Sequence, residues 1–261
     1  PAPPARKDGT PVTARIDLNS LPRHRVLRLV LSPRRILADL LSKGWVESTV
    51  PFLAFIATVI GIVLATDGYF TAANLRNLAL YAGDGGLVIL AMLIVVAAGG
   101  LDLSVGSSFA MSAFVALYAF HILGLPVPAV LLLSLTSGLA VGMVNGTLAG
   151  LIGCGALLTT LGMMITVRGL FTLASQSQLV AIASSTRMDD SWDWIGFEKL
   201  LTMPVGFWVL AAVAVAVFVM FRQSRLGWHV LAVGGNRKAA RHGGIGVRGT
   251  VFTAYALAGL I

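Results

Sequence analysis

Long apolar stretches separated by short polar links follow one another along most of this chain. Each is near the length of about 17–25 residues with which a helix crosses a bilayer. They fall at roughly 50–66, 74–98, 104–123, 127–149, 156–174 and 203–221, and another begins near residue 250. A membrane barrel would show short alternating segments instead. The pattern predicts an all-α polytopic membrane protein, a multi-span helical bundle of about six complete spans and the start of a seventh.

The second span contains the letters GDGG at residues 83–86. Three glycines and a carboxylate in mid-span predict a broken or distorted helix, which a bilayer tolerates only against protein or a water-filled cavity. Asp84 has few partners at that depth, so it is protonated, pairs with Arg168 of the fifth span, or faces a cavity. A structural and a functional role for Asp84 both stay open.

The fourth span carries a glycine at every fourth position. Glycines with that spacing lie on one helix face and let a neighbouring backbone approach closely. We predict a helix-packing face, with a role in gating as the alternative. Its members are Gly138, Gly142, Gly146 and Gly150.

Charge is scarce and unevenly distributed. Charged residues make up 11% of the chain and hydrophobic residues 57%, with a mean hydropathy of +0.87, whereas a soluble domain carries about 25% charged residues. The net charge is +8; residues 222–249 hold six Lys or Arg and no acid, whereas residues 174–203 are net acidic. Because basic loops stay in the cytoplasm, we expect 222–249 and the N-terminus inside. Orientation and contact with anionic membrane lipid explain the basic residues better than nucleic-acid binding, so no nucleic acid is expected.

The chain before the first span divides in two. Residues 1–22 are proline-rich and polar, which predicts a disordered cytoplasmic tail. Residues 23–49 alternate basic and aliphatic positions, which is typical of an amphipathic juxtamembrane segment. Residues 50–261 are then the transmembrane domain, with 222–249 as a cytoplasmic loop.

The stretch GGLDLSVGS, residues 99–107, joins the second and third spans. Its two glycines can end one helix, and Asp102 and Ser104 can cap the next. Ionisable residues within membranes are costly and mark functional sites, so the same residues are also candidates for a solute pathway. The two interpretations are compatible. The candidate pathway residues are Asp84, Asp102, Ser104, Asn145, Thr160 and Arg168.

The sequence shows no residue set typical of an enzyme or a metal centre. There is no Ser/His/Asp arrangement, paired-carboxylate site, phosphate loop or dinucleotide fingerprint, and one cysteine allows no intrachain disulfide. We expect no catalytic activity, no cofactor and no metal. A proton-coupled secondary transporter that uses Asp84 or Asp102 stays open as an alternative, and an integral-membrane enzyme is disfavoured.

Three blocks of the chain resemble, in the same order, the blocks of a known family. GGLDLSVGS resembles the GGIDLSVGS signature of permease subunits from ABC importers for ribose and related monosaccharides. Residues 142–170 resemble that family's NG, TLG and RGL elements, and residues 225–247 are similar to its cytoplasmic segment. The acid in YAGDGG departs from the small or hydroxyl residues expected there. Because family members continue through further spans, the resemblance implies that this chain is truncated at its C-terminus.

The resemblance also implies a mechanism in the bacterial inner membrane. Two permease subunits, identical or paralogous, form the pathway for a monosaccharide that an extracytoplasmic sugar-binding protein delivers. A separate cytoplasmic ATPase hydrolyses ATP, and residues 222–249 dock on it through a segment with a short helix at about 236–242 and glycine turns. The coupling residues implied are Arg225, Gly227, Gly234, Gly235, Asn236, Ala239, Ala240, Gly244 and Ile245.

Overall fold

The computed structural model describes residues 44–197 and 199–261, with side chains for 49–196 and 200–261. The chain divides into two compact units, residues 1–69 and 70–261. The predicted tail at 1–22 and most of the predicted amphipathic segment at 23–49 lie outside the described residues. In the first unit, helix α3 (Gly44–Ala65) covers the first predicted span and begins earlier than expected.

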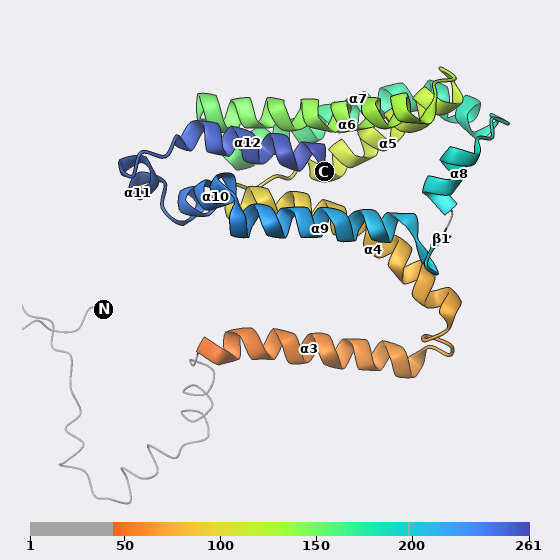
Figure 1. Ribbon diagram of the computed structural model, residues 1–261, viewed down its shortest axis with the longest axis horizontal. Coiled ribbons are helices and arrows are strands. Elements are labelled where there is room, and N and C mark those ends of the chain that lie inside the picture. The colour runs from red at the N-terminus through yellow and green to blue at the C-terminus, as the bar shows by residue number, and fades with distance from the viewer. Residues whose placement is uncertain (1–43, 198) are drawn as a thin grey trace, which may run out of the picture. The chain divides into compact units, whose positions relative to one another are not determined.

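The second unit is a bundle of helices joined by short connections (Figure 1). The long helices are α4 (Ala72–Ala97), α5 (Val105–His121), α6 (Val127–Gly146), α7 (Ala156–Ala183), α9 (Val205–Gln223) and α12 (Val247–Leu260). The smaller elements are a π-helical segment (Thr147–Ile152), α8 (Asp190–Phe197), the paired strands β1 (Lys199–Leu200) and β2 (Met203–Pro204), α10 (Arg225–Gly235) and α11 (Arg237–His242).

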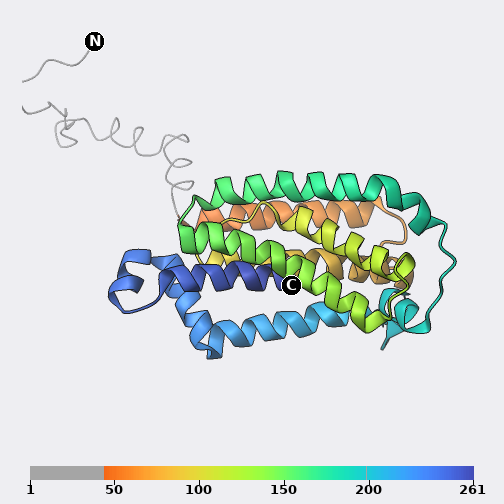
Figure 2. The ribbon, with the colours of Figure 1, turned by 90° about the horizontal axis from the view of Figure 1, so that it is seen from above.

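The long helices pack in two groups that α12 joins. Helix α4 packs against α9, whereas α5 packs against α6 and α7, and α12 contacts both α6 and α4 (Figure 2). Val95 of α4, Val230 of α10 and Tyr255 of α12 are completely buried. Helix α8 lies at one end of this unit, and α10 and α11 lie at the other. The fold therefore separates the acidic and the basic connections, as the charge pattern predicted.

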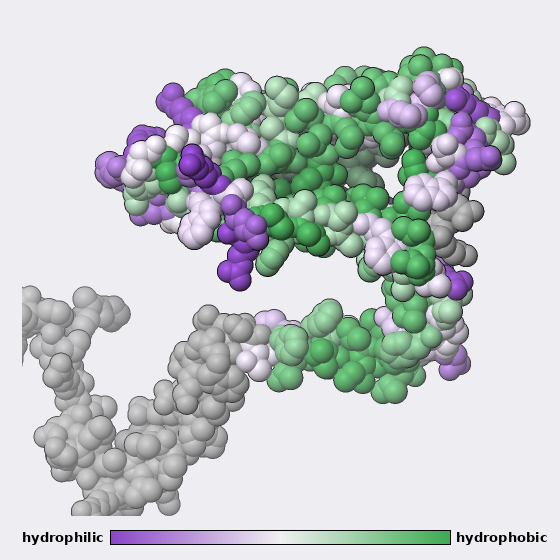
Figure 3. All heavy atoms as spheres, viewed as in Figure 1, coloured by the Kyte–Doolittle hydropathy of each residue, from purple (hydrophilic) through white to green (hydrophobic). Residues whose placement is uncertain are grey.

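Hydrophobic residues cover the sides of the second unit, and hydrophilic residues gather at its α8 and α10–α11 ends (Figure 3). Within residues 44–197 and 199–261, four helical stretches are long and apolar enough to cross a membrane: α4, α6 with its π-helical segment, α7 and α9. Residues 49–65 of α3 and all of α5 form shorter apolar helices. The chain is an all-α polytopic membrane protein, as predicted, and the number of complete spans stays a prediction.

The prediction of a broken helix at GDGG is wrong, because α4 runs uninterrupted through residues 83–86. The glycines serve close packing instead. A Cβ atom on Gly83 would lie 3.0 Å from the backbone of Gly206 in α9, and one on Gly86 would lie 2.6 Å from the Leu210 side chain. The irregular helical backbone lies elsewhere, in the π-helical segment after α6, a distortion that is frequent at functional sites.

Two predicted loops contain more helix than expected. Helix α7 continues to Ala183 instead of ending near 174, because no Gly or Pro interrupts residues 170–183. In the basic loop, Gly234 and Gly235 lie inside α10 rather than in turns, so that expectation is also wrong. The short helix predicted at 236–242 is confirmed as α11, where the Asn236 carboxamide oxygen accepts the first-turn N–H groups.

Candidate translocation site

Residues 98–104 form the connection from α4 to α5, called here the 98–104 turn. Gly99 adopts a left-handed backbone with φ +70°, which glycine tolerates without steric cost. A side chain on Gly99 would also meet α10, because an added Cβ atom would lie 3.2 Å from Gly234 Cα. The glycine pair therefore ends α4, as predicted, and Gly99 lets the turn pack closely against α10.

Asp102, Ser104 and Asn145 form a buried chain of hydrogen bonds. Asp102 is 7% exposed, and the other two are completely buried. Ser104 donates its N–H and its hydroxyl to Asp102 Oδ1 at 2.8 and 2.7 Å, and Asn145 Nδ2 donates to Ser104 Oγ at 2.7 Å. Ser104 precedes α5, but its side chain bonds no first-turn amide. Asp102 and Ser104 therefore lie at the start of α5, as predicted. Neither side chain caps the first-turn amides of the helix, because Asp102 accepts hydrogen bonds from Ser104 instead.

One atom of this chain lacks a partner. The Ser104 hydroxyl gives its hydrogen to Asp102, so it must accept from Asn145, which orients the amide nitrogen of Asn145 toward Ser104. The amide oxygen of Asn145 is then buried with no hydrogen-bond partner among the described residues. A buried unpaired acceptor is costly and occurs at sites with a function.

The carbonyl of Leu101 joins the same turn to two more helices. Tyr255 of α12 donates its hydroxyl to this carbonyl at 3.0 Å. The Thr160 hydroxyl of α7 lies 3.3 Å from it and shares its hydrogen with the Ala156 carbonyl of its own helix at 3.0 Å. Both side chains are completely buried. Thr160 therefore supports the turn, and it is not among the residues that line the cavity beside it.

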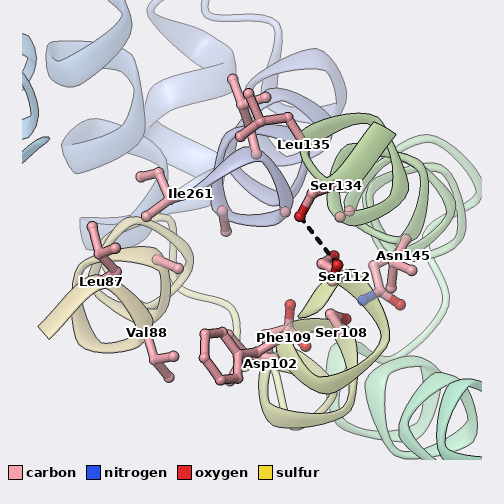
Figure 4. A pocket seen from close by; sticks show the side chains of 18 of the residues that line it. Leu87, Val88, Asp102, Ser108, Phe109, Ser112, Ser134, Leu135, Asn145 and Ile261 are labelled. Carbon is pink, nitrogen blue, oxygen red and sulfur yellow. Dashed lines mark hydrogen bonds between the residues drawn. The ribbon is translucent and has the colours of Figure 1, made fainter. Parts of the chain in front are cut away.

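A cavity of about 190 Å³ lies between α4, α5, α6 and α12 (Figure 4). Helices α4 and α12 supply an apolar wall that includes Leu87, Val88 and Ile261. The opposite wall comes from α5, α6 and the 98–104 turn, and it mixes apolar side chains such as Phe109, Leu135 and Val141 with polar ones. The polar members, called here the polar wall, are Asp102, Ser108, Ser112, Ser134 and Asn145.

The polar wall offers hydrogen-bond acceptors. Ser108 donates its hydroxyl to the Ser104 carbonyl at 3.0 Å, and Ser134 donates to the Ser112 carbonyl at 3.1 Å, a bond drawn in Figure 4. These bonds use the hydroxyl hydrogens and leave oxygen lone pairs. The cavity lining contains no Lys, Arg or His. The arrangement suits an uncharged ligand that donates hydrogen bonds.

The structure separates the two predicted mid-span charges. Asp84 is exposed on α4 and lies three and four residues before Leu87 and Val88, so it shares their cavity-lining helix face one turn away. Arg168 is exposed on α7. In the described part of the chain Asp84 and Arg168 form no ion pair, so the predicted pairing is wrong. Their exposure leaves both side chains accessible.

The glycine face of α6 lies against α12. A Cβ atom on Gly146 would lie 2.7 Å from the Phe252 carbonyl oxygen, and one on Gly150 would lie 2.7 Å from the Phe252 nitrogen. Added Cβ atoms on Gly138 and Gly142 would overlap carbonyl oxygens of α12. These glycines allow the close approach that brings Tyr255 to the 98–104 turn.

Most of the predicted coupling residues are exposed on α10, α11 and the turn that follows. Gly227 and Ala240 are the buried exceptions, and Ile245 is half-buried. Gly227 packs against α9 beside Phe221, and Ala240 packs with Val247 and Val251 of α12. The exposed members are Arg225, Gly234, Gly235, Asn236, Ala239 and Gly244.

Comparison with known proteins adds an independent line of support. The family described as "Branched-chain amino acid transport system / permease component" matches residues 74–261. The ribose import permease protein RbsC of Escherichia coli K12 is 29% identical over 84% of this chain and 68% of its own length. The L-arabinose permease AraH of that strain is 30% identical over 80% and 62%, and the fructose import permease FruF of Bifidobacterium longum 30% over 67% and 49%.

The chain belongs to the permease family of ABC importers for ribose and related sugars. The three relatives are transport permeases and not enzymes. No solved structure matches the chain.

Sequence reasoning on this sugar permease missed several residues of the site. Ser108 and Ser112 follow Ser104 at four-residue intervals, a spacing that could have marked one polar helix face. Tyr255 and Arg237 carry no local signal, because their partners lie in the distant 98–104 turn.

Proposed function

We propose that this chain is the permease subunit of an ABC importer and that its cavity lies on the pathway of a monosaccharide across the bacterial inner membrane. An extracytoplasmic binding protein delivers the sugar, a second permease subunit completes the pathway, and separate ATPase subunits drive transport. The observation that carries this proposal is the cavity of about 190 Å³ with one polar wall inside a helical bundle. Family membership supports the partners.

The chemistry of the cavity favours a sugar over an amino acid. An amino acid brings a carboxylate, and no cation lines the cavity to balance it. A monosaccharide brings hydroxyl hydrogens, which Asp102 and Ser134 can accept. Ser104 and Thr160 support this wall from behind, and Asp84 extends the same face of α4.

The charge pattern supports a cytoplasmic N-terminus and a cytoplasmic α10–α11 segment. Basic residues concentrate in 222–249, and acidic residues concentrate near α8, at the opposite end of the second unit. The exposed residues of α10 and α11 form the surface that docks on the ATPase. Arg168, exposed on α7, is the predicted pathway residue with the weakest support.

A proton-coupled transporter remains the second candidate, because Asp84 is an exposed carboxylate within an apolar helix. Uptake of radiolabelled D-ribose, L-arabinose, D-fructose and L-leucine by cells that express the importer genes separates the two. An ATP-driven importer keeps taking up its sugar when the proton gradient is collapsed and stops when ATP is depleted. The opposite result would establish the alternative, and preferred uptake of leucine would overturn the sugar assignment.

The cavity itself is tested by removing hydroxyls. The double variant Ser108→Ala and Ser134→Ala should lower sugar uptake about 25-fold, because each lost hydrogen bond is worth about 1 kcal/mol, or about fivefold. Ser177→Ala on α7 is the control, since Ser177 is exposed and is not among the residues that line the cavity. Equal uptake by both variants at equal expression would remove the cavity from the pathway.

A further inference from the structure

The 98–104 turn receives contacts from α6, α7, α10, α11 and α12. Few segments of this size contact so many helices, because a turn normally lies at the edge of a fold. Ala98 and Gly99 contact the α10–α11 segment, and Asp102 lines the cavity. The same turn therefore contacts both the segment proposed to dock on the ATPase and the cavity proposed to lie on the sugar pathway.

The side of the turn toward α10 and α11 is held by Arg237 and Gly234. Arg237 Nη2 donates a hydrogen bond to the Gly99 carbonyl at 3.1 Å, and this bond is exposed. An added Cβ atom on Gly234 would overlap the Ala97 carbonyl oxygen, so the end of α10 lies directly on the start of the turn. Through these two contacts, a displacement of α10 and α11 also moves Gly99.

The side toward the cavity begins two residues later. The Leu101 carbonyl accepts from Tyr255 and Thr160, and Asp102 accepts from Ser104, which accepts from Asn145. Asp102 and Asn145 line the cavity. Between the Gly99 and Leu101 carbonyls lies Gly100, and glycine is the residue type whose backbone changes conformation with least steric cost.

We infer that Arg237 and Tyr255 are positioning residues that hold the two sides of the 98–104 turn, and that this turn passes movements of α10 and α11 to the cavity wall. This inference rests on the proposed function. Arg237 holds the turn at Gly99, where the ATPase-facing segment meets it, and Tyr255 holds it at Leu101, next to the cavity wall. Gly100, between these two points, is the hinge.

The first experiment compares two charges on α11 in the assembled transporter. Both Arg237 and Lys238 belong to the proposed docking surface, so either variant removes one positive charge from it. Only Arg237→Ala also removes a side-chain bond to the turn, the one to Gly99. Proteoliposomes with binding protein and ATPase report sugar transported per ATP hydrolysed, using the best sugar of the uptake panel. We expect this ratio to fall about fivefold for Arg237→Ala, the value of one lost hydrogen bond, and less than twofold for Lys238→Ala.

Equal ratios for the two variants would overturn the inference. So would a complex that assembles with Lys238→Ala and no longer assembles with Arg237→Ala, because the arginine would then serve docking. If the unmodified transporter shows no ATP-driven uptake, the proposed function fails instead, and the two failures are thus distinguishable.

The second experiment asks whether Arg237 and Tyr255 act through one element. Tyr255→Phe removes a single hydroxyl, and Tyr118→Phe on α5 is its control. If both residues act through the turn, the double variant Arg237→Ala and Tyr255→Phe should lie within about twofold of the worse single variant. If each single variant lowers the transport-to-hydrolysis ratio about fivefold and the two effects are independent, the double variant would lower it about 25-fold. That result would overturn the inference. A purely structural role would change the amount of folded complex and leave the transport-to-hydrolysis ratio unchanged.

Discussion

The two ends of α5 meet different surroundings. At the α4–α5 end, the Leu101 carbonyl accepts hydrogen bonds from Tyr255 of α12 and Thr160 of α7. At the α5–α6 end, one guanidinium donates to two carbonyls: Arg187 Nη1 bonds Phe120 at 2.6 Å and Nη2 bonds Leu125 at 2.9 Å. Both ends use side-chain donors, because carbonyls in a last helical turn, such as that of Phe120, and carbonyls in connections, such as those of Leu101 and Leu125, lack helical partners.

The α5–α6 end is a closed local clamp. The Arg187 guanidinium also lies 4.3 Å from the centre of the Phe120 ring, and Trp192 of α8 stacks on that ring at 4.4 Å. These contacts join α5 and α6 to the connection that precedes α8, and the cavity lining contains none of these residues. Both ends of α5 thus use side-chain hydrogen bonds to backbone carbonyls. At the α4–α5 end the donors come from two distant helices, whereas at the α5–α6 end one residue, Arg187, supplies both bonds.

This contrast predicts different consequences of substitution. A residue of the clamp should change the free energy of unfolding and leave the transport rate of each folded molecule unchanged. Substitution of a residue of the cavity wall should lower the transport rate of each folded molecule and leave the free energy of unfolding nearly unchanged.

The largest effect is expected for Arg187→Ala. It leaves two carbonyls without their charged donor and removes a cation–π contact, so the free energy of unfolding should fall by about 2–3 kcal/mol. Reversible unfolding in mixed micelles by added SDS measures this. Arg222→Ala is the control, because Arg222 is exposed and lies 5.8 Å from the Phe218 ring. A loss no larger than that of the control would contradict the clamp.

Asn145→Leu should show the opposite signature. Leucine removes the donor to Ser104, which destabilises, but it also removes the buried unpaired oxygen, which stabilises. We expect the free energy of unfolding to change by less than about 1 kcal/mol. Sugar uptake should nevertheless fall about tenfold, a loss of about 1.4 kcal/mol of interaction with the solute. Uptake that falls only in proportion to folded protein would make Asn145 a packing residue.

The sequence predicted one end of α5 far better than the other. GGLDLSVGS draws attention because glycines and a carboxylate are unusual between apolar spans, and Asp102 and Ser104 do meet at the α5 start. Arg187 entered the sequence argument only as one charge in an acidic loop. Its partners are backbone carbonyls more than 60 residues away, and a carbonyl has no sequence signature.

The glycines illustrate the same limit. Regular spacing on α6 correctly indicated close packing, although it could not name α12 as the neighbour. The glycines of GDGG looked like a helix break, because a glycine that fits a close helix contact and one that breaks a helix are the same letter. Their close approach to α9 appears only when the two helices are brought together.

Thr160→Val should have a smaller effect at the α4–α5 end. Valine keeps the side-chain volume nearly unchanged and removes one donor, while Tyr255 still bonds the Leu101 carbonyl. The free energy of unfolding should fall by about 0.5–1 kcal/mol. Thr136→Val on α6 is the control, since the Thr136 hydroxyl is exposed and bonds only its own helix. A loss above about 2 kcal/mol would mean that Thr160, rather than Tyr255, is the main support of Leu101.

The smallest effect, and one of opposite sign, is expected at the α5–α6 end for His121→Phe. The His121 ring lies edge-on to Phe120 at 4.9 Å and to Trp192 at 6.3 Å, and its Nδ1 is buried with no partner in the described chain. Phenylalanine keeps the edge-to-face geometry and removes the unpaired nitrogen, so unfolding in SDS should require about 0.5–1 kcal/mol more. His229→Phe, on the exposed side of α10, should give no gain. A destabilised His121→Phe variant would mean that Nδ1 has a partner, and that the clamp extends further along α5 than Arg187 alone accounts for.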